Sequence, residues 1–145
     1  MPESTTPIPF THLRLHTEFS INDGLLTIGP LINRLNDLQM PAVALTDLAN
    51  LFGLIKFYSS ATRTGIKPIC GCDLVVVDNE GAASHIVLLV KNHTGYLNLT
   101  RLISELYTEA AGIAEPVVNQ EALAKYSEGL IALSGGLKSR TSLAV

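Results

Sequence analysis

Strand-like and helix-like segments alternate along most of this chain of 145 residues. Short apolar runs typical of buried strands are followed by stretches in which apolar side chains recur every three or four positions. This alternation predicts an α/β fold of alternating βα units around a largely parallel sheet. The expected strands cover residues 10–16, 42–45, 66–78, 85–90 and 130–133. The expected helices run from a Thr27 cap to Met40 and over residues 51–64, 94–110 and 120–126.

The composition narrows the class of protein further. A hydrophobic content of 47% permits a sizeable core, and the net charge of −3 argues against a stand-alone nucleic-acid binder. Apolar runs stay below the roughly 18 residues that a membrane helix needs, and the first residues lack a secretory h-region. Cys70 and Cys72 are too few for a disulfide framework. We therefore expect a cytoplasmic protein that contacts no membrane, with residues 1–8 as a flexible leader.

Polar side chains gather where the expected strands end. Function in parallel α/β folds is concentrated at the carboxyl ends of the strands. Imidazoles and carboxylates that meet there are suited to a metal site, since both are good ligands. The alternative is that each is a polar residue at a strand end with a local hydrogen bond. The candidate positions are His12, Arg14, His16, Asp23, Thr46, Asp47, Gly71, Asp73 and the Ser134-Gly135-Gly136 turn.

Arg14 is the most informative of these positions. A guanidinium stays charged and cannot ligate a metal, so it repels a nearby divalent ion. Arg14 therefore replaces a ligand or takes the place of the ion, and we expect it to pair with Asp47 or Asp73.

The remaining candidates carry weaker signals. The Cys70-x-Cys72 spacing suits zinc, but no second ligand pair lies near it, which favours two buried small side chains. His85 and His93 flank an apolar strand, and we expect them to cap it or to face solvent. The Ser134-Gly135-Gly136 turn offers backbone amides to a phosphate, a weak signal by itself even with Lys138 and Arg140 nearby.

Five segments taken together resemble one family. They match, in order, the N-terminal PHP (polymerase and histidinol phosphatase) domain of bacterial DNA polymerase III alpha subunits. The matching segments are FTHLRLHTEFSINDG (10–24), PAVALTDLANLFG (41–53), GIKPICGCD (65–73), KNHTGYLNLTRL (91–102) and GLIALSGG (129–136).

This resemblance implies a fold and a domain organisation. The PHP fold is a distorted seven-stranded (β/α) barrel, and residues 9–145 would form its N-terminal portion, with the parent chain continuing beyond. A closed eight-stranded barrel needs roughly 250 residues, so this length also suits part of a barrel on independent grounds.

The resemblance also implies that the metal pocket of the family is degenerate here. Metal-retaining members hold up to three ions with a His-x-His motif, which reads Arg14-Leu15-His16 in this chain. Their Thr-Asp-His-Gly motif reads Thr46-Asp47-Leu48-Ala49 in this chain. The glutamate that is usual in their third motif is replaced by Asp73. A later Asp-x-His motif would lie beyond residue 145. The pattern is similar to proteobacterial alpha subunits, so no catalytic residue and no bound metal are expected. The vestigial pocket positions would be His12, Arg14, His16, Asp23, Asp47 and Asp73.

The function implied is structural. In such polymerases the PHP domain supports the polymerase core and binds the proofreading exonuclease subunit, while DNA contact and Mg²⁺-dependent nucleotidyl transfer belong to other parts of the parent chain. The main alternative is a metal-dependent PHP phosphoesterase or 3′–5′ exonuclease with zinc or manganese in the pocket. A third reading is a small phosphate-binding α/β domain. Arg14 and Leu48 favour the structural role over the phosphoesterase.

Overall fold

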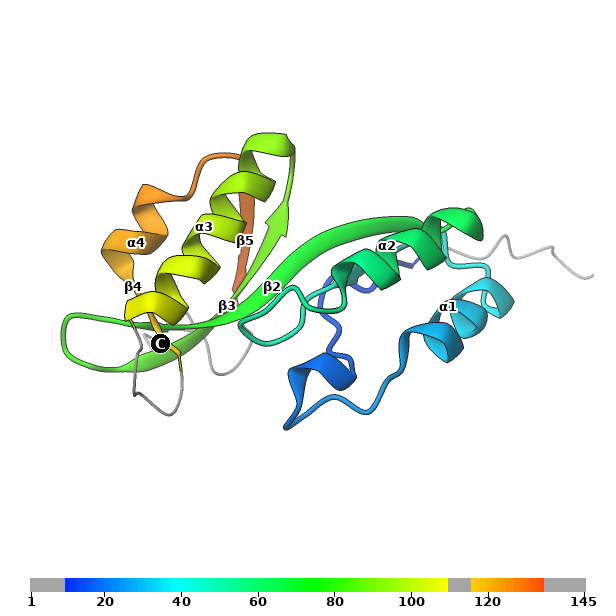
Figure 1. The fold of residues 1–145 in the computed structure, drawn as a ribbon, viewed down its shortest axis with the longest axis horizontal. Helices are drawn as coiled ribbons and strands as arrows, with labels where there is room; N and C mark the ends of the chain where they lie inside the picture. The colour runs from blue at the N-terminus through cyan, green and yellow to red at the C-terminus, as the bar shows by residue number, and fades with distance from the viewer. Residues whose placement is uncertain (1–9, 110–115, 135–145) are drawn as a thin grey trace, which may run out of the picture.

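The computed structural model describes residues 10–109 and 116–134, in which helices and strands alternate except where two strands follow each other as a hairpin (Figure 1). The expected leader, Gly135, Gly136, Lys138 and Arg140 lie outside the described residues. The elements, in chain order, are η1 (Glu18–Ser20), α1 (Ile28–Asp37), β1 (Ala42–Leu45), α2 (Leu54–Arg63), β2 (Lys67–Val77), β3 (Ala83–Val90), α3 (His93–Glu109), β4 (Val118–Asn119), α4 (Gln120–Lys125) and β5 (Leu130–Ser134).

The helices form where the apolar period is three to four. In α1 this period buries Leu31, Ile32 and Leu35 on one face, as expected. Thr27 occupies the N-cap position, but its side chain makes no capping hydrogen bond. Helix α2 begins at Leu54 rather than at residue 51, because Asn50 accepts a hydrogen bond from the Phe52 amide in the turn that precedes it.

The sheet is mixed, which corrects the expectation of a largely parallel one. Its order is β1-β2-β3-β5, and β4 pairs with β2. Strands β1 and β4 run parallel to β2, whereas β2 with β3 and β3 with β5 are antiparallel. The physical reason is the short connection 78–82, since a parallel pair needs a crossover of a dozen or more residues. The α/β class is confirmed, and β4 is an additional strand that the sequence did not predict.

The expected first strand, residues 10–16, forms a single isolated bridge. His12 pairs with Val43 in a parallel bridge, and the amides of Ala44 and Thr46 donate to the carbonyls of His12 and Leu15. The segment therefore runs beside β1 without a regular ladder. This placement still carries its side chains to the edge of the sheet.

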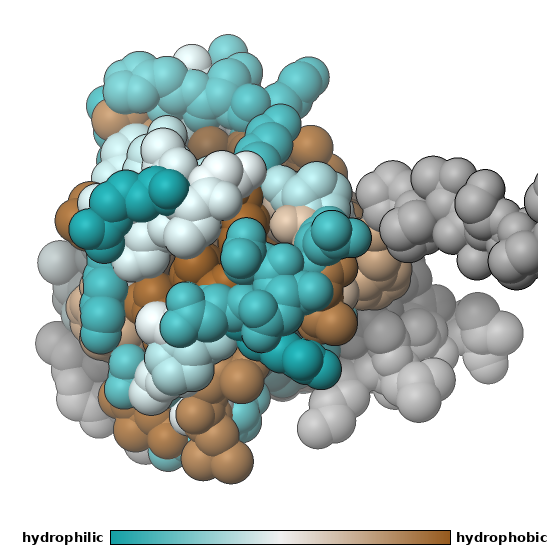
Figure 2. Space-filling view, turned by 90° about the vertical axis from the view of Figure 1, so that its right-hand side faces the viewer, coloured by the Kyte–Doolittle hydropathy of each residue, from teal (hydrophilic) through white to brown (hydrophobic). Residues whose placement is uncertain are grey.

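Three apolar clusters hold the described elements together. The first joins α1, β1 and α2 around Phe57, and the second joins β2, β3 and α3 around Leu88 and Leu99. The third is smaller and contains Ala44, Val87 and Leu89. Each large side chain buried in this way contributes about 1.5–3 kcal/mol to folding. On the side where α1 and α2 lie, hydrophobic patches stand between hydrophilic groups (Figure 2). Within the described part of the chain, no helix has the length and apolar character needed to cross a membrane.

Candidate functional site

The carboxylate of Asp73, in the middle of β2, is the centre of a polar cluster. It is fully buried, and three side chains contact it. Nε and Nη2 of Arg14 donate to Oδ2 at 2.7 and 2.6 Å. The Nε2 atom of His16 lies 3.0 Å from the same oxygen, and Nδ1 of His85 lies 3.3 Å from Oδ1. The pairing of Arg14 with an acidic neighbour, expected from the sequence, is therefore confirmed.

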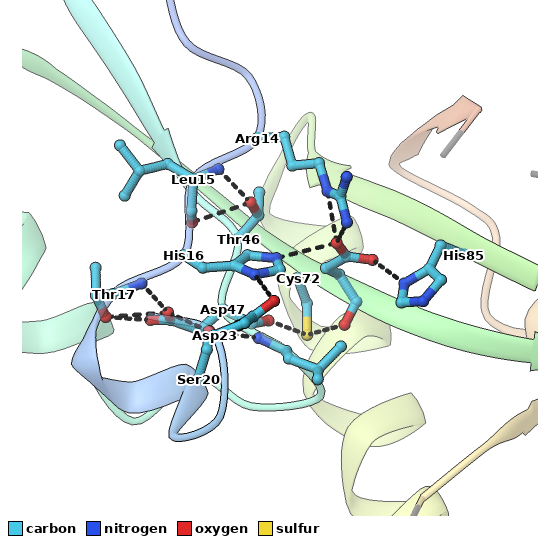
Figure 3. A network of polar contacts seen from close by, with 12 residues as sticks. Arg14, Leu15, His16, Thr17, Ser20, Asp23, Thr46, Asp47, Cys72 and His85 are labelled. Atoms are coloured by element: carbon cyan, nitrogen blue, oxygen red, sulfur yellow. Dashed lines mark hydrogen bonds and ion pairs between the residues drawn. The ribbon is translucent and has the colours of Figure 1, made fainter. Parts of the chain in front are cut away.

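Three elements bring these side chains together. Arg14 and His16 are two positions apart on the extended segment beside β1, so both point the same way (Figure 3). Asp73 pairs with Val87 across the β2–β3 ladder, while His85 pairs with Val75. His85 is thus the diagonal neighbour of Asp73 on one face of the sheet.

Charge and burial shift the pKa values in this cluster in opposite directions. The hydrogen bond to Asp73 is the main cause that raises the pKa of His16 above 6.5; burial opposes it, and Asp23 adds to it. Burial alone would raise the pKa of Asp73, but hydrogen bonds with His16 and Arg14 outweigh it and hold that pKa below its usual value. Asp73 is therefore held in its carboxylate form by its hydrogen bonds with His16 and Arg14.

His16 also connects the buried carboxylate to the surface. Its Nδ1 atom lies 2.8 Å from Oδ2 of Asp23, which is half exposed. When the ring is protonated, both nitrogens donate, one to each carboxylate. The imidazolium thus ties the turn that follows η1 to β2.

Asp47 forms a second, separate cluster. It follows β1 and is almost fully buried. Its Oδ1 accepts from the amide of Thr17 at 2.6 Å and from the hydroxyl of Ser20 at 2.8 Å, and its Oδ2 accepts from the Thr17 hydroxyl at 2.8 Å (Figure 3). Ser20 in turn accepts from the Leu48 amide. These bonds fix the η1 turn against the end of β1.

The two cysteines belong to the apolar interior. The Cys72 thiol donates to the backbone carbonyl of Asp47 at 3.3 Å, and burial raises its pKa. Burial also raises the pKa of Cys70, to about 11. Cys72 is buried, as expected, whereas Cys70 is only partly buried.

The structure brings together four of the six predicted pocket positions: Arg14, His16, Asp23 and Asp73. Asp47 lies in the neighbouring cluster, linked through its carbonyl to the amide of Asp73 at 3.2 Å. His12 is exposed, and its ring packs edge-on against Phe10, so it does not face Asp73. His85 was expected only to cap its strand or to face solvent, and that expectation was wrong; its signal lies in the register of β2 with β3.

These residues do not fit the metal centre that metal-dependent members of such a fold hold. The guanidinium of Arg14 donates a hydrogen bond to Oδ2 of Asp73, and both carboxylate oxygens of Asp47 accept hydrogen bonds from Thr17. Over residues 10–109 and 116–134, no group of three or more His, Cys, Asp or Glu side chains is placed to hold an ion.

Comparison with protein families gives a match over most of the chain. The family model described as "PHP domain" matches residues 12–145. The DNA polymerase III subunit alpha of Pseudomonas fluorescens is 45% identical over 96% of this chain and 12% of its own length. That of Escherichia coli K12 is 46% identical over 88% of this chain and 11% of its own. The chain thus spans about one eighth of the curated relatives that it matches.

Solved structures show the same fold. A putative metal-dependent phosphoesterase from Bifidobacterium adolescentis aligns with a TM-score of 0.56 and 19% identity, over 85% of this chain and 45% of that one. An amidohydrolase from Chromobacterium violaceum, with bound SO4 and no metal, aligns with a TM-score of 0.54 and 26% identity, over 72% of this chain and 40% of that one.

Proposed function

The chain belongs to the PHP domain family, and we propose that it acts as a structural and partner-binding module of a DNA polymerase III alpha subunit in DNA replication. The identity of 45% to such a subunit over 96% of this chain supports this role. In this proposal nucleotidyl transfer and its Mg²⁺ belong to the rest of the polymerase chain. The segment itself is non-catalytic and works in the cytoplasm.

The contact between Arg14 and Asp73 is the observation that carries the non-catalytic role. A phosphoesterase of this fold needs metal ions to polarise the phosphoryl group and to activate water. Here a fixed positive charge lies 2.6 Å from an oxygen of Asp73, a carboxylate of the kind that coordinates metal ions. A divalent ion next to this guanidinium would be repelled, so the cluster stabilises the fold instead of catalysing hydrolysis.

Elemental analysis tests this role against the alternative of a metal-dependent phosphoesterase or 3′–5′ exonuclease. The purified chain is incubated with Zn²⁺ or Mn²⁺, desalted, and assayed for bound metal and for hydrolysis of a 3′-labelled single-stranded oligonucleotide. We expect well under one ion per chain and no hydrolysis. Two or more stoichiometric ions together with hydrolysis would support the phosphoesterase.

A matched variant makes the metal measurement interpretable. The double substitution Arg14→His/Leu48→His restores the two histidines that the family motifs contain. We expect it to bind one ion under the conditions in which the unaltered chain binds none. Equal metal contents in the two proteins would show that Arg14 does not control metal binding.

The proposed partners are the remainder of the polymerase chain and the proofreading exonuclease subunit, with DNA reached only through the parent chain. Mixing the chain with purified exonuclease subunit and measuring the mass of the complex by sedimentation tests the second of these. A stoichiometric complex is the expected result. Two species that sediment independently at micromolar concentration would contradict it.

A further inference from the structure

A groove between α2 and the start of α3 is lined mainly by apolar side chains. Its volume is about 470 Å³. Cys70 of β2 and Val90 of β3 line it together with Ile55 and Tyr58 of α2 and Tyr96 of α3. The groove is separate from the Asp73 cluster, since it shares no lining residue with it.

Two of the lining side chains are exposed although they are large and apolar or aromatic. Ile55 is 75% exposed and Tyr58 is 56% exposed. Neighbouring Cys70 adds no charge, because burial raises the pKa of its thiol to about 11. An apolar hollow with exposed anchors of this kind is typical of a protein-binding surface.

The groove continues along α2. A second hollow of about 400 Å³ is lined by Tyr58, Ser59, Thr62 and Arg63. Tyr58 and Ser59 line both hollows. Helix α2 has ten residues and is thus about 15 Å long, so the combined groove suits a segment of a few helical turns.

The groove lies in a part of the chain that carries no negative charge. Residues 48–72 and 81–104 contain none of the 13 acidic residues but five of the ten Lys and Arg residues. All residues that line the two hollows come from these two stretches. The five cations are Lys56, Arg63, Lys67, Lys91 and Arg101. In a chain with a net charge of −3, this is a pronounced local excess of positive charge.

We propose that this groove binds a short amphipathic helix of a partner protein, with apolar side chains in the groove and acidic residues beside them. Helix-in-groove recognition supplies apolar anchors at intervals of three or four residues. Arg63 lines the second hollow, and Lys56 and Lys91 are chain neighbours of residues that line the first. Acidic residues on the partner helix would therefore complement the positive charges beside the groove. Apart from Ser59, Asn92 and His93, the lining of the first hollow is aliphatic, aromatic or thiol, and it contains no lysine or arginine. This favours apolar side chains over a nucleic-acid backbone, which would need such cations along the floor.

Two synthetic helical peptides test the proposal on the 145-residue chain. They share leucine and phenylalanine anchors at i, i+3, i+4 and i+7 and differ only in flanks of glutamate or lysine; a single-stranded oligothymidine is the third probe. Fluorescence anisotropy gives the affinities, and amide chemical shifts locate the binding site. We expect the glutamate-flanked peptide to bind about tenfold or more tightly than the lysine-flanked one, with shifts in α2 and at the start of α3.

Matched variants separate the apolar from the electrostatic contribution. Ile55→Ser/Tyr58→Ser removes two exposed anchors without opening the core, and we expect it to weaken the glutamate-flanked peptide about tenfold or more. Lys56→Glu/Lys91→Glu should reverse the preference between the two peptides. Leu25→Ser, at a 97% exposed site outside the groove, and Arg34→Glu on α1 are the controls and should bind as the unaltered chain does.

Several outcomes would overturn the proposal. These are equal affinity for the two peptides, tighter binding of oligothymidine than of either peptide, or shifts that lie outside the groove. Self-association of the chain that Ile55→Ser/Tyr58→Ser abolishes would assign the groove to a second copy and would also overturn it. None of these outcomes bears on the metal content of the Asp73 cluster, so the proposed non-catalytic role stands or falls separately.

Discussion

The Nη2 atom of Arg14 lies 2.6 Å from Oδ2 of Asp73, although 59 positions separate the two residues in the chain. The arginine side chain is 47% exposed, whereas the aspartate is fully buried. The pair is therefore asymmetric: the buried carboxylate depends on the arginine more than the arginine depends on it. A buried charge without its partner is costly, and this asymmetry determines what substitutions on each side should do.

Replacing Arg14 by methionine should destabilise the fold. The substitution keeps much of the aliphatic side chain but leaves Asp73 with only the two histidines. Because half of the guanidinium is solvated, we expect a loss of about 1–3 kcal/mol in the free energy of unfolding, measured in urea. The control Arg34→Met, at an exposed position on α1, should change it by less than about 0.5 kcal/mol. Equal effects of the two substitutions would contradict a stabilising role for the ion pair.

Stability should be highest between about pH 4 and pH 6.5. The pKa of His16 is raised on folding, so its contribution is complete below 6.5 and is lost as the pH rises through the raised value. The pKa of Asp73 is lowered on folding, so its contribution is complete above 3.8 and is lost as the pH falls through the lowered value. Urea unfolding across this pH range measures both slopes.

The variant His16→Gln assigns the alkaline slope. It removes the imidazolium but keeps a side chain that forms hydrogen bonds, so the decline above pH 6.5 should flatten. His12→Gln, which alters an exposed histidine packed on Phe10, is the matched control and should retain the decline. If the slope survives in His16→Gln, another group is responsible for it.

Local patterns in the sequence predict most elements, but they do not determine how the strands pair. The spacing of Leu31, Ile32 and Leu35 places the buried face of α1 correctly, since that face depends only on the helical period. Strand direction depends on the connection instead. Only residues 79–84 separate the expected strands 66–78 and 85–90, and so short a connection produces an antiparallel pair, which contradicts the parallel sheet that the alternation of elements suggests.

In the candidate site, too, some contacts could be predicted from the sequence and others depend on how the strands pair. The pairing of Arg14 with a carboxylate could be predicted from the sequence, because Asp47 and Asp73 are acidic and were expected at the same edge of the sheet. The contact of His85 with Asp73 depends on the register of β2 with β3, which no local pattern reveals. His12 was expected in the pocket with Arg14 and His16, but its segment makes a single isolated bridge and no regular strand, and its ring packs against Phe10.

Asp47 should be more important for the fold than its place in a metal-binding motif suggests. Asp47→Ala would leave the buried Thr17 amide and the Ser20 hydroxyl without their acceptor. We expect a loss of about 2–4 kcal/mol in unfolding free energy and faster hydrogen exchange at the Thr17 amide. Asp47→Asn retains one acceptor oxygen and should lose less. Asp37→Ala, at the exposed end of α1, is the control; a similar small effect for Asp47→Ala would contradict the structural role.

The start of α3 should tolerate no side chain at Gly95. A Cβ built there would run into the backbone carbonyl of Gly129, in the turn that leads into β5, and that backbone cannot move aside as a flexible side chain does. Gly95→Ala should therefore lower the free energy of unfolding by about 1–3 kcal/mol, measured in urea. Gly29, in the first turn of α1, faces open space. It precedes Pro30, which disfavours the helical conformation for an alanine at position 29, and this opposes the gain from the lost freedom of the unfolded chain. Gly29→Ala should therefore change the free energy of unfolding by less than about 0.5 kcal/mol. Both substitutions replace glycine by alanine in a first helical turn, so a clearly larger loss at Gly95 isolates its close approach to Gly129. Equally small effects of both would mean that α3 does not press against Gly129 in solution.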